Sequence, residues 1–168
     1  MKRSEINKLQ KKAVEFFQKQ NFYLPKWAFW SEDQWQTNRE LATEIFEKKL
    51  GWDITDFGLG NFEKTGLLLF TIRNGKYGSE NDKMYAEKIM IVREEQVTPW
   101  HLHWNKTEDI INRGGGNLVI ELSNSTEDEQ LANTTVHVQI DGITHTIHSK
   151  GKVILEPGES ITLPPFKP

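Results

Sequence analysis

The first fifty residues place apolar side chains at helical spacing. Between residues 4 and 20, apolar positions recur every three or four residues among lysines and glutamines, which predicts an amphipathic helix with Ser4 as its N-cap. A second pattern of this kind runs from 37 to 50, and Gly51 can end it. The stretch 22–35 between them is rich in aromatic residues and contains a proline. We therefore expect an irregular segment there, lying across a hydrophobic surface.

After Gly51 the pattern changes to short apolar or alternating runs separated by turn signals, which are typical of strands. The predicted strands are Trp52–Phe57, Gly66–Arg73, Tyr85–Arg93, Asn117–Leu122, Thr134–Ile140, Ile143–His148 and Ser160–Leu163. The dipeptide Asp141-Gly142 joins two alternating runs and predicts a hairpin. Its candidate core positions are Val136, Val138, Ile140, Ile143 and Ile147. Many short strands at even spacing indicate a sandwich or a barrel.

Length and charge limit the organisation and the partners. A chain of 168 residues suits one well-buried domain, which we divide into an N-terminal helical segment, 1–51, and a β domain, 52–168. A net charge of −3 with mixed signs along the chain gives no basic field for nucleic acid or anionic lipid. We find neither an apolar run long enough for a bilayer nor a signal peptide, and we expect a cytoplasmic protein. Without cysteine, a metal site must use histidine, carboxylate and water.

The candidate chemistry lies between residues 98 and 109. In a strand, side chains two positions apart point to the same face, so His101 and His103 can bring two imidazoles to one ion. Glu108 follows five residues later, which is enough for the chain to turn and return a carboxylate. Such a donor set suits manganese, iron or zinc, and sequence does not rank them. The alternative is a pair of strand histidines that merely bond to water or backbone.

Two segments resemble the motifs of the cupin superfamily. Residues 99–103, Glu108 and the glycines from Gly114 onwards are similar to the first cupin motif, which joins His-x-His to a glutamate and a later glycine. Residues 157–165 resemble the opening of the second motif, which leads to a further histidine. Cupins are double-sheet jelly rolls with the site inside the barrel. The resemblance therefore implies a mainly β chain, a cupin-type jelly-roll β-barrel with an N-terminal helical layer.

More narrowly, residues 101–115 together with the long helical and aromatic N-terminal part are similar to the D-lyxose isomerases. This resemblance covers nearly the whole chain. It implies a metal-dependent aldose–ketose isomerase that converts D-lyxose to D-xylulose, with His101, His103 and Glu108 as metal ligands. Manganese is the expected metal, with iron, cobalt or zinc as alternatives. The implied partners are a small sugar substrate and a second copy of the chain in a homodimer.

The resemblance also implies roles in the reaction. Aldose–ketose isomerisation through a cis-enediol moves a hydrogen between neighbouring carbons while a cation stabilises charge on the sugar oxygens. Glu108 is the implied proton-transfer residue as well as a ligand. Lys88 is the implied substrate-binding residue, and by strand alternation it shares a face with Met90 and Val92. A solvent-facing lysine at the start of a strand is the alternative for Lys88.

Other polar residues near these positions are ambiguous. Lys106 and Asp109 flank Glu108 and are either partners of its carboxylate or solvated side chains in a polar turn. The remaining histidines flank the predicted hairpin, and we expect them on the surface rather than at the metal. They are His137, His145 and His148.

The chain departs from the family pattern at its end. It finishes at residues 166–168, just before the position at which the family has a further histidine ligand and the strands that close the barrel. We therefore expect an incomplete barrel with weakened metal binding. The alternatives are another metal-dependent cupin enzyme, such as an oxygenase, or a shortened cupin without catalytic activity. A metal-free carbohydrate-binding sandwich leaves the spacing of the two histidines and the glutamate unexplained.

Overall fold

The computed structural model describes residues 1–76 and 78–165 and divides into two compact units, Met1–Pro99 and Trp100–Pro168. Antiparallel strands dominate both units, and the helices of the described residues precede the first strand. This confirms a mainly β, cupin-like fold with an N-terminal helical layer. The expected domain boundary at residue 51 stays a prediction. The expected departure from the family pattern falls at residues 166–168, outside the described residues.

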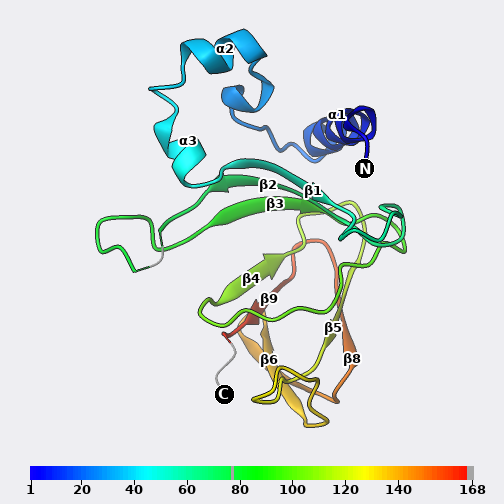
Figure 1. The fold of residues 1–168 in the computed structure, drawn as a ribbon. Coiled ribbons are helices and arrows are strands. Elements are labelled where there is room, and N and C mark those ends of the chain that lie inside the picture. Colours follow the sequence, from blue (N-terminus) through cyan, green and yellow to red (C-terminus); the bar gives the residue numbers. More distant parts are fainter. Residues whose placement is uncertain (77, 166–168) are drawn as a thin grey trace. The chain divides into compact units, whose positions relative to one another are not determined.

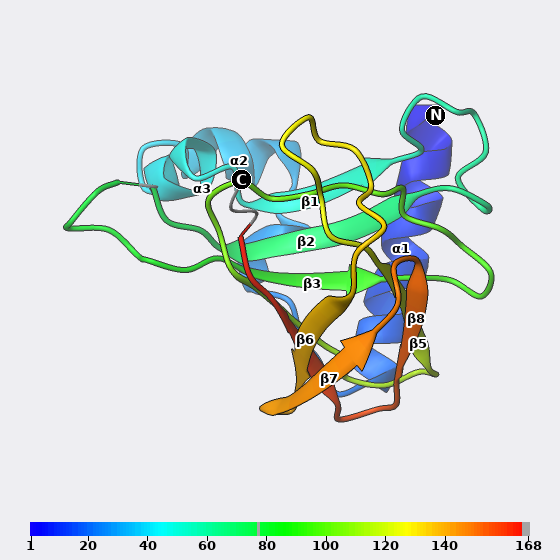
Figure 2. The same cartoon turned by 90° about the horizontal axis from the view of Figure 1, so that it is seen from below.

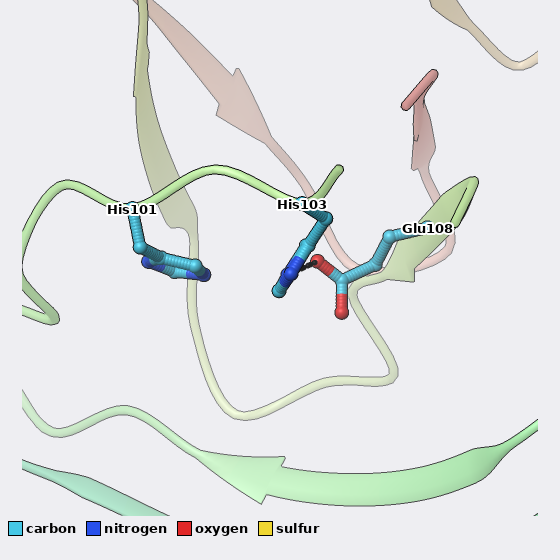
Figure 3. A group of neighbouring side chains, drawn as sticks. All are labelled: His101, His103 and Glu108. Carbon is cyan, nitrogen blue, oxygen red and sulfur yellow. Dashed lines mark ion pairs between the residues drawn. The ribbon is translucent and has the colours of Figure 1, made fainter. Parts of the chain in front are cut away.

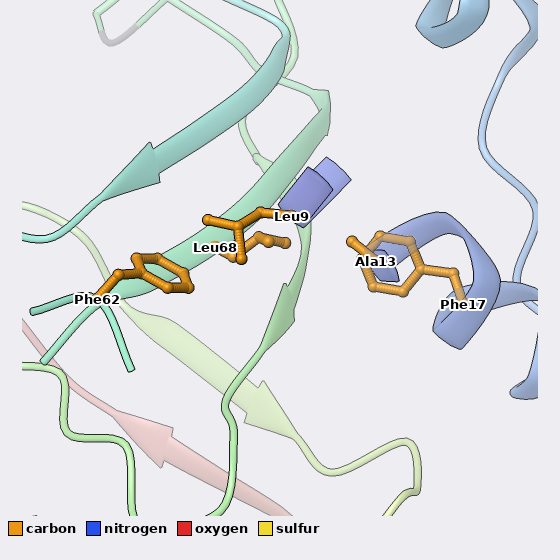
Figure 4. Packing of buried hydrophobic residues seen from close by; sticks show 5 residues of the cluster. All are labelled: Leu9, Ala13, Phe17, Phe62 and Leu68. Carbon is orange, nitrogen blue, oxygen red and sulfur yellow. The ribbon is translucent and has the colours of Figure 1, made fainter. Parts of the chain in front are cut away.

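Helix α1 (Arg3–Lys19) forms where the sequence predicts it, and it packs through one face. Leu9, Ala13 and Phe17 are spaced by four residues and are all buried, because positions four apart lie above one another on a helix. They form a hydrophobic cluster with Phe62 and Leu68 (Figure 4). Within the described ranges, no helix combines the length and the apolar character that crossing a membrane requires.

The start of α1 differs from the prediction. Lys2, not Ser4, is the N-cap residue, and its N–H donates to Glu5 Oε2 at 2.6 Å. Ser4 lies inside the first turn, so its prediction as the N-cap is wrong. The carboxylate of Glu5 reaches back to an otherwise unpaired backbone N–H and lies at the positive end of the helix, where negative charge is favourable.

The prediction of a single second helix over residues 37–50 is also wrong. The structure has two short helices instead, α2 (Glu32–Thr37) and α3 (Thr43–Glu47). Ser31 Oγ accepts a bond from Gln34 N–H at 3.3 Å, and the Gln34 side chain accepts one from Ser31 N–H at 2.9 Å. This capping box starts the helical region earlier than the apolar pattern indicates.

The aromatic segment lies on a hydrophobic surface, as predicted. It contains the short 3-10 helix η1 (Lys26–Phe29). Trp27 stacks on Phe70 with ring centroids 4.9 Å apart, and Trp52 meets the same ring edge-on at 5.1 Å. Aromatic contacts of this kind stabilise beyond the area they bury. The contact of Trp27 attaches the segment to the sheet of the first unit, whereas Trp52 is itself part of that sheet, on its first strand.

That sheet has the antiparallel order β1-β2-β3, with β1 (Gly51–Thr55), β2 (Leu67–Arg73) and β3 (Glu87–Ile91). In the central strand, residues 68–71 are all buried, which matches a continuous apolar run rather than an alternating one. Figure 1 shows the helices gathered over one face of this sheet. Phe70 belongs to that face, because its ring contacts Trp27 of the helical part.

The second unit is built from two sheets around its own core. Their orders are β4-β9-β6-β7 and β5-β8, all antiparallel. The strands are β4 (Glu108–Ile111), β5 (Leu118–Leu122), β6 (Val136–Ile140), β7 (Ile143–Ile147), β8 (Gly151–Leu155) and β9 (Ser160–Leu163). The core contains the buried residues Val138, Val153, Leu155 and Ile161. This unit carries the candidate metal ligands.

The predicted hairpin is confirmed, with β6 and β7 side by side (Figure 2). Asp141 and Gly142 have φ of 49° and 80°, the left-handed values that a two-residue hairpin turn with the twist of its strands requires. Val136 and Val138 are buried as predicted, whereas Ile143 is 65% exposed. The prediction of Ile143 as a core residue is therefore wrong, because Ile143 adjoins the turn on β7, the edge strand of its sheet.

Candidate metal centre

The two histidines lie on a segment that precedes β4. Among the described residues, positions 101–103 belong to no strand, so the prediction of a strand for this pair is wrong. The side chains of His101 and His103 nevertheless leave the segment on the same side (Figure 3), with ring centroids 5.1 Å apart. The common orientation that the spacing predicts is thus obtained without strand pairing.

Glu108 completes the group from the first position of β4. Pairing of this strand with β9 places Glu108 opposite Leu163. The carboxylate Oε2 lies 3.2 Å from His103 Nε2. One ligand atom from each of His101, His103 and Glu108 lies within 4.8 Å of the others. The structure therefore brings the three predicted side chains together within a single unit.

The surroundings of the group favour the neutral form of one imidazole. Burial, together with the positive charge of Lys106, lowers the pKa of His103 below its usual value, against the opposing effect of Glu108. Lys106 Nζ also lies 3.3 Å from Glu108 Oε1. A neutral imidazole has a nitrogen lone pair for a metal, whereas a protonated one has none. The electrostatics thus favour the protonation state that metal coordination needs.

The donor set fits a divalent first-row metal. Two imidazole nitrogens and a carboxylate oxygen are the ligand types that manganese, iron, cobalt and zinc accept. Ligand atoms about 2.1 Å from a common ion lie roughly 3 to 4 Å from one another. The group spans 4.8 Å, so small side-chain rotations bring its atoms into coordinating positions.

The remaining predicted residues are placed as follows. Lys88 lies on β3 in the first unit, opposite Thr71, and its side chain is exposed, so its role in substrate binding stays a prediction. Asp109 accepts a hydrogen bond from Thr162 Oγ1 at 2.6 Å. Of the two neighbours predicted as partners of the carboxylate, Lys106 contacts it, and the role of Asp109 stays a prediction. The hairpin histidines are exposed, as predicted: His137, His145 and His148.

Sequence reasoning gave no role to Asn112, the residue that follows β4. Its side chain is buried, with 6% of its surface exposed, and it bonds to backbone atoms of Gly114, Gly116 and Leu155. An asparagine before Arg-Gly-Gly-Gly is a local signal for a turn in which the side chain bonds to the backbone. Nothing in the sequence signals the bond to Leu155, which lies 43 residues further along the chain.

Comparison with known proteins gives a consistent result over nearly the full chain. The family model described as D-lyxose isomerase matches residues 1–167. A D-lyxose/D-mannose isomerase from Escherichia coli O157:H7 is 50% identical over 167 residues, which are 98% of this chain and 74% of that protein. A protein of the same name from Serratia proteamaculans is 48% identical over 98% of this chain and 73% of its own length.

These similarities define the class of the protein first: it is an enzyme, and its class is that of the sugar isomerases. More narrowly, the chain belongs to the D-lyxose isomerase family, as the resemblance of its motifs implies. A small-molecule sugar is accordingly its substrate.

Proposed function

We propose that this protein is a metal-dependent isomerase that interconverts D-lyxose and D-xylulose, with His101, His103 and Glu108 as the metal ligands and manganese as the metal. The observation that carries the proposal is the convergence of two imidazoles and one carboxylate within 4.8 Å in a chain of the D-lyxose isomerase family. Iron, cobalt or zinc suit the same donors, so manganese is the choice to be tested.

The reaction transfers one proton between neighbouring carbons of the sugar. The bound cation supplies Lewis-acid polarisation of the substrate oxygens. Glu108 takes the proton from C2 of the aldose, and the same proton is delivered to C1, while a hydroxyl proton passes from O2 to O1. The second carboxylate oxygen of Glu108 has a role here, because one oxygen can bind the cation while the other holds the proton. Lys88 provides a positive charge to a substrate oxygen.

We extend the substrate range to D-mannose. D-Mannose and D-lyxose have the same configuration at C2, C3 and C4 and differ beyond C4. The chemistry takes place at C1 and C2, so a site that accepts one aldose presents the same reacting carbons to the other. The names of the relatives, D-lyxose/D-mannose isomerase, support this extension.

Ketose formation from each aldose tests the proposal. We expect metal-stripped protein to be inactive, manganese to restore turnover, and His101→Ala to reduce it by at least about 100-fold, as loss of a metal ligand exceeds the 10- to 100-fold effect of losing an outer partner. His148→Ala is the matched control, because His148 is an exposed histidine of the same unit, and it should retain full activity. Equal turnover by wild type and His101→Ala contradicts the assignment.

We also propose that the protein acts in the cytoplasm as a homodimer. The outer strand β7 supports the pairing: it lies at the edge of its sheet, and Ile143 on it is 65% exposed. Edge strands present unpaired backbone groups that a second copy can bind. Light scattering should give twice the chain mass of 19.5 kDa, and a value of one chain mass contradicts the dimer.

A further inference from the structure

The sequence of β4 does not by itself determine which of its faces is buried. The strand reads Glu108-Asp109-Ile110-Ile111, a pair of carboxylates followed by a pair of isoleucines. Side chains alternate between faces, so a shift of one residue moves each of them to the opposite face. Such a shift puts Asp109 in the place of Glu108 and Ile111 in the place of Ile110. Both registers therefore present a carboxylate and an isoleucine to the core.

The structure has one of these registers. Glu108 lies opposite Leu163, and Asp109 lies opposite Thr162. Glu108 Oε2 is 3.2 Å from His103 Nε2, whereas Asp109 accepts a hydrogen bond from Thr162 on the other face of the strand. The choice between two neighbouring carboxylates decides which of them joins the histidines, and the hydrophobic pattern of β4 does not make that choice.

The side chain of Asn112 distinguishes the two registers. It comes directly after β4 and is 6% exposed. Its Nδ2 donates to Gly116 O and to Leu155 O, both at 2.8 Å, and its Oδ1 accepts from Gly114 N–H at 3.0 Å. The amide is thus matched to two carbonyls and one N–H at a single buried point. This point lies between the turn formed by residues 114–116 and the end of β8.

The backbone of Asn112 also forms hydrogen bonds, to the turn that precedes β9. Asn112 N–H donates to Glu159 O at 2.9 Å, and Gly158 N–H donates to Asn112 O at 2.7 Å. In the shifted register Arg113 takes the buried place of Asn112. A guanidinium cannot accept the bond from Gly114 N–H and carries a charge that is costly to bury. The native register is therefore favoured at residue 112 rather than within β4.

We propose that Asn112 is a positioning residue of the metal centre, whose buried amide fixes the β4 register in which Glu108 rather than Asp109 faces His101 and His103. The inference rests on the proposed function, because it assigns a role toward the proposed metal site. It adds a residue that touches neither metal nor substrate and acts through the strand that carries a ligand.

A cross-link between β4 and β9 provides the test. The chain has no cysteine, so a pair introduced by Asp109→Cys and Thr162→Cys forms the sole available disulfide. Directly opposite residues on antiparallel strands have Cα atoms about 4.5 to 5.5 Å apart, within the disulfide range of about 4.4 to 6.8 Å. The cross-link fixes the native register without Asn112. The measurement is Mn²⁺ affinity, with and without reductant, in the native and Asn112→Ala backgrounds.

We expect Asn112→Ala to lower Mn²⁺ affinity at least about tenfold, the scale at which lost outer partners weaken metal sites. The oxidised cross-link should restore the affinity in that background, and reduction should remove it again. Asn124→Ala is the matched control, since its side chain also donates to Thr134 Oγ1 and Thr135 O in the same unit, away from β4. It should leave Mn²⁺ affinity unchanged. If Asn112→Ala folds only when the cross-link is oxidised, this result also supports the role of Asn112.

Two results overturn the inference: native Mn²⁺ affinity in Asn112→Ala, or an oxidised cross-linked variant that binds as weakly as the reduced one. A failure of the proposed function is seen separately, because Glu108→Gln in the native background then leaves Mn²⁺ binding unchanged. In that event the yield of the disulfide, whose formation requires no metal, reports which register β4 adopts. A lower yield in Asn112→Ala supports the role of Asn112, and an equal yield contradicts it.

Discussion

Glu108 already has two partners that a cation has to displace or share. Its carboxylate contacts His103 through one oxygen and Lys106 through the other, at 3.2 and 3.3 Å. Both contacts bring positive or hydrogen-bond donor character to a carboxylate that lies at the start of a strand. A divalent cation gives the same carboxylate a stronger attraction, because it carries two charges at a shorter distance. Local contacts therefore hold the side chain where coordination requires it.

A charge pair in the first unit gives the stability of the protein a pH dependence. The Arg93 guanidinium bonds to Glu63, and this bond and its charge lower the pKa of the Glu63 carboxyl below its usual value. A carboxyl with a lowered pKa in the folded state stabilises the fold above its ordinary pKa, and the effect disappears as the pH falls through the lowered value. Glu63 is largely exposed, so the contribution is small.

We therefore expect Glu63→Gln to lower the free energy of unfolding at pH 7 by about 0.5 kcal/mol, the scale of an exposed pair. The difference from wild type should shrink as the pH falls below the ordinary pKa of a carboxyl, because the wild-type carboxyl of Glu63 then becomes protonated. Urea unfolding across this pH range measures it. The double-mutant cycle with Arg93→Gln provides the control. In that background the pH-dependent effect of Glu63→Gln should be clearly smaller, since only the charges of Lys8 and Lys12 still act on the carboxyl, and an undiminished effect would contradict the pairing.

At the scale of elements, prediction from sequence succeeds where alternation and turn residues agree. The Asp141-Gly142 turn and the alternation of β6 are both local, so the hairpin follows from them. Strands β4 and β8 were not predicted, because their definition is not local. β4 has four residues and no alternation, and β8 begins in the polar run Ser149-Lys150-Gly151-Lys152. Their partners, β9 and β5, are distant in the sequence.

The packing of β8 gives an element-scale prediction. Leu155 is fully buried, whereas its neighbour Ile154 is 58% exposed on the other face of the strand. Leu155→Ala leaves a cavity and should lower the free energy of unfolding by about 2 to 5 kcal/mol. Ile154→Ala is the matched control and should cost about 0.5 kcal/mol or less. Denaturant unfolding compares them, and equal losses contradict the assigned faces.

At the scale of the whole molecule, the structure has two units with separate cores. The first core joins α1 to Leu68 of β2, and the second surrounds Leu155 and Ile161. The change from helical to strand patterns after Gly51 is visible in local spacing and predicts a mainly β chain with a helical start, whereas the cupin barrel is what the resemblance of the motifs implies. The sequence did not predict the division after Pro99, since which strands pair with which depends on contacts between distant segments.

The candidate site was predictable to a similar degree. The spacing of His101 and His103 predicts that both side chains lie on one side of the chain, and the position of Glu108 five residues later predicts that its carboxylate can join them. The prediction of a strand for the two histidines is wrong, because residues 101–103 follow a proline and belong to no strand in the described part of the chain. The contacts of Lys106 and Asn112 required the structure, since alternation says nothing about hydrogen bonds across a turn.

The most direct test is to identify the ligands of Mn²⁺ bound to the protein by electron spin echo spectroscopy. Coupling from imidazole nitrogen reports histidine coordination. We expect nitrogen coupling in wild type, its reduction in both His101→Ala and His103→Ala, and no change in the control His148→Ala. A wild-type spectrum without nitrogen coupling, or one unaffected by loss of His101 and His103, would contradict the metal centre proposed here.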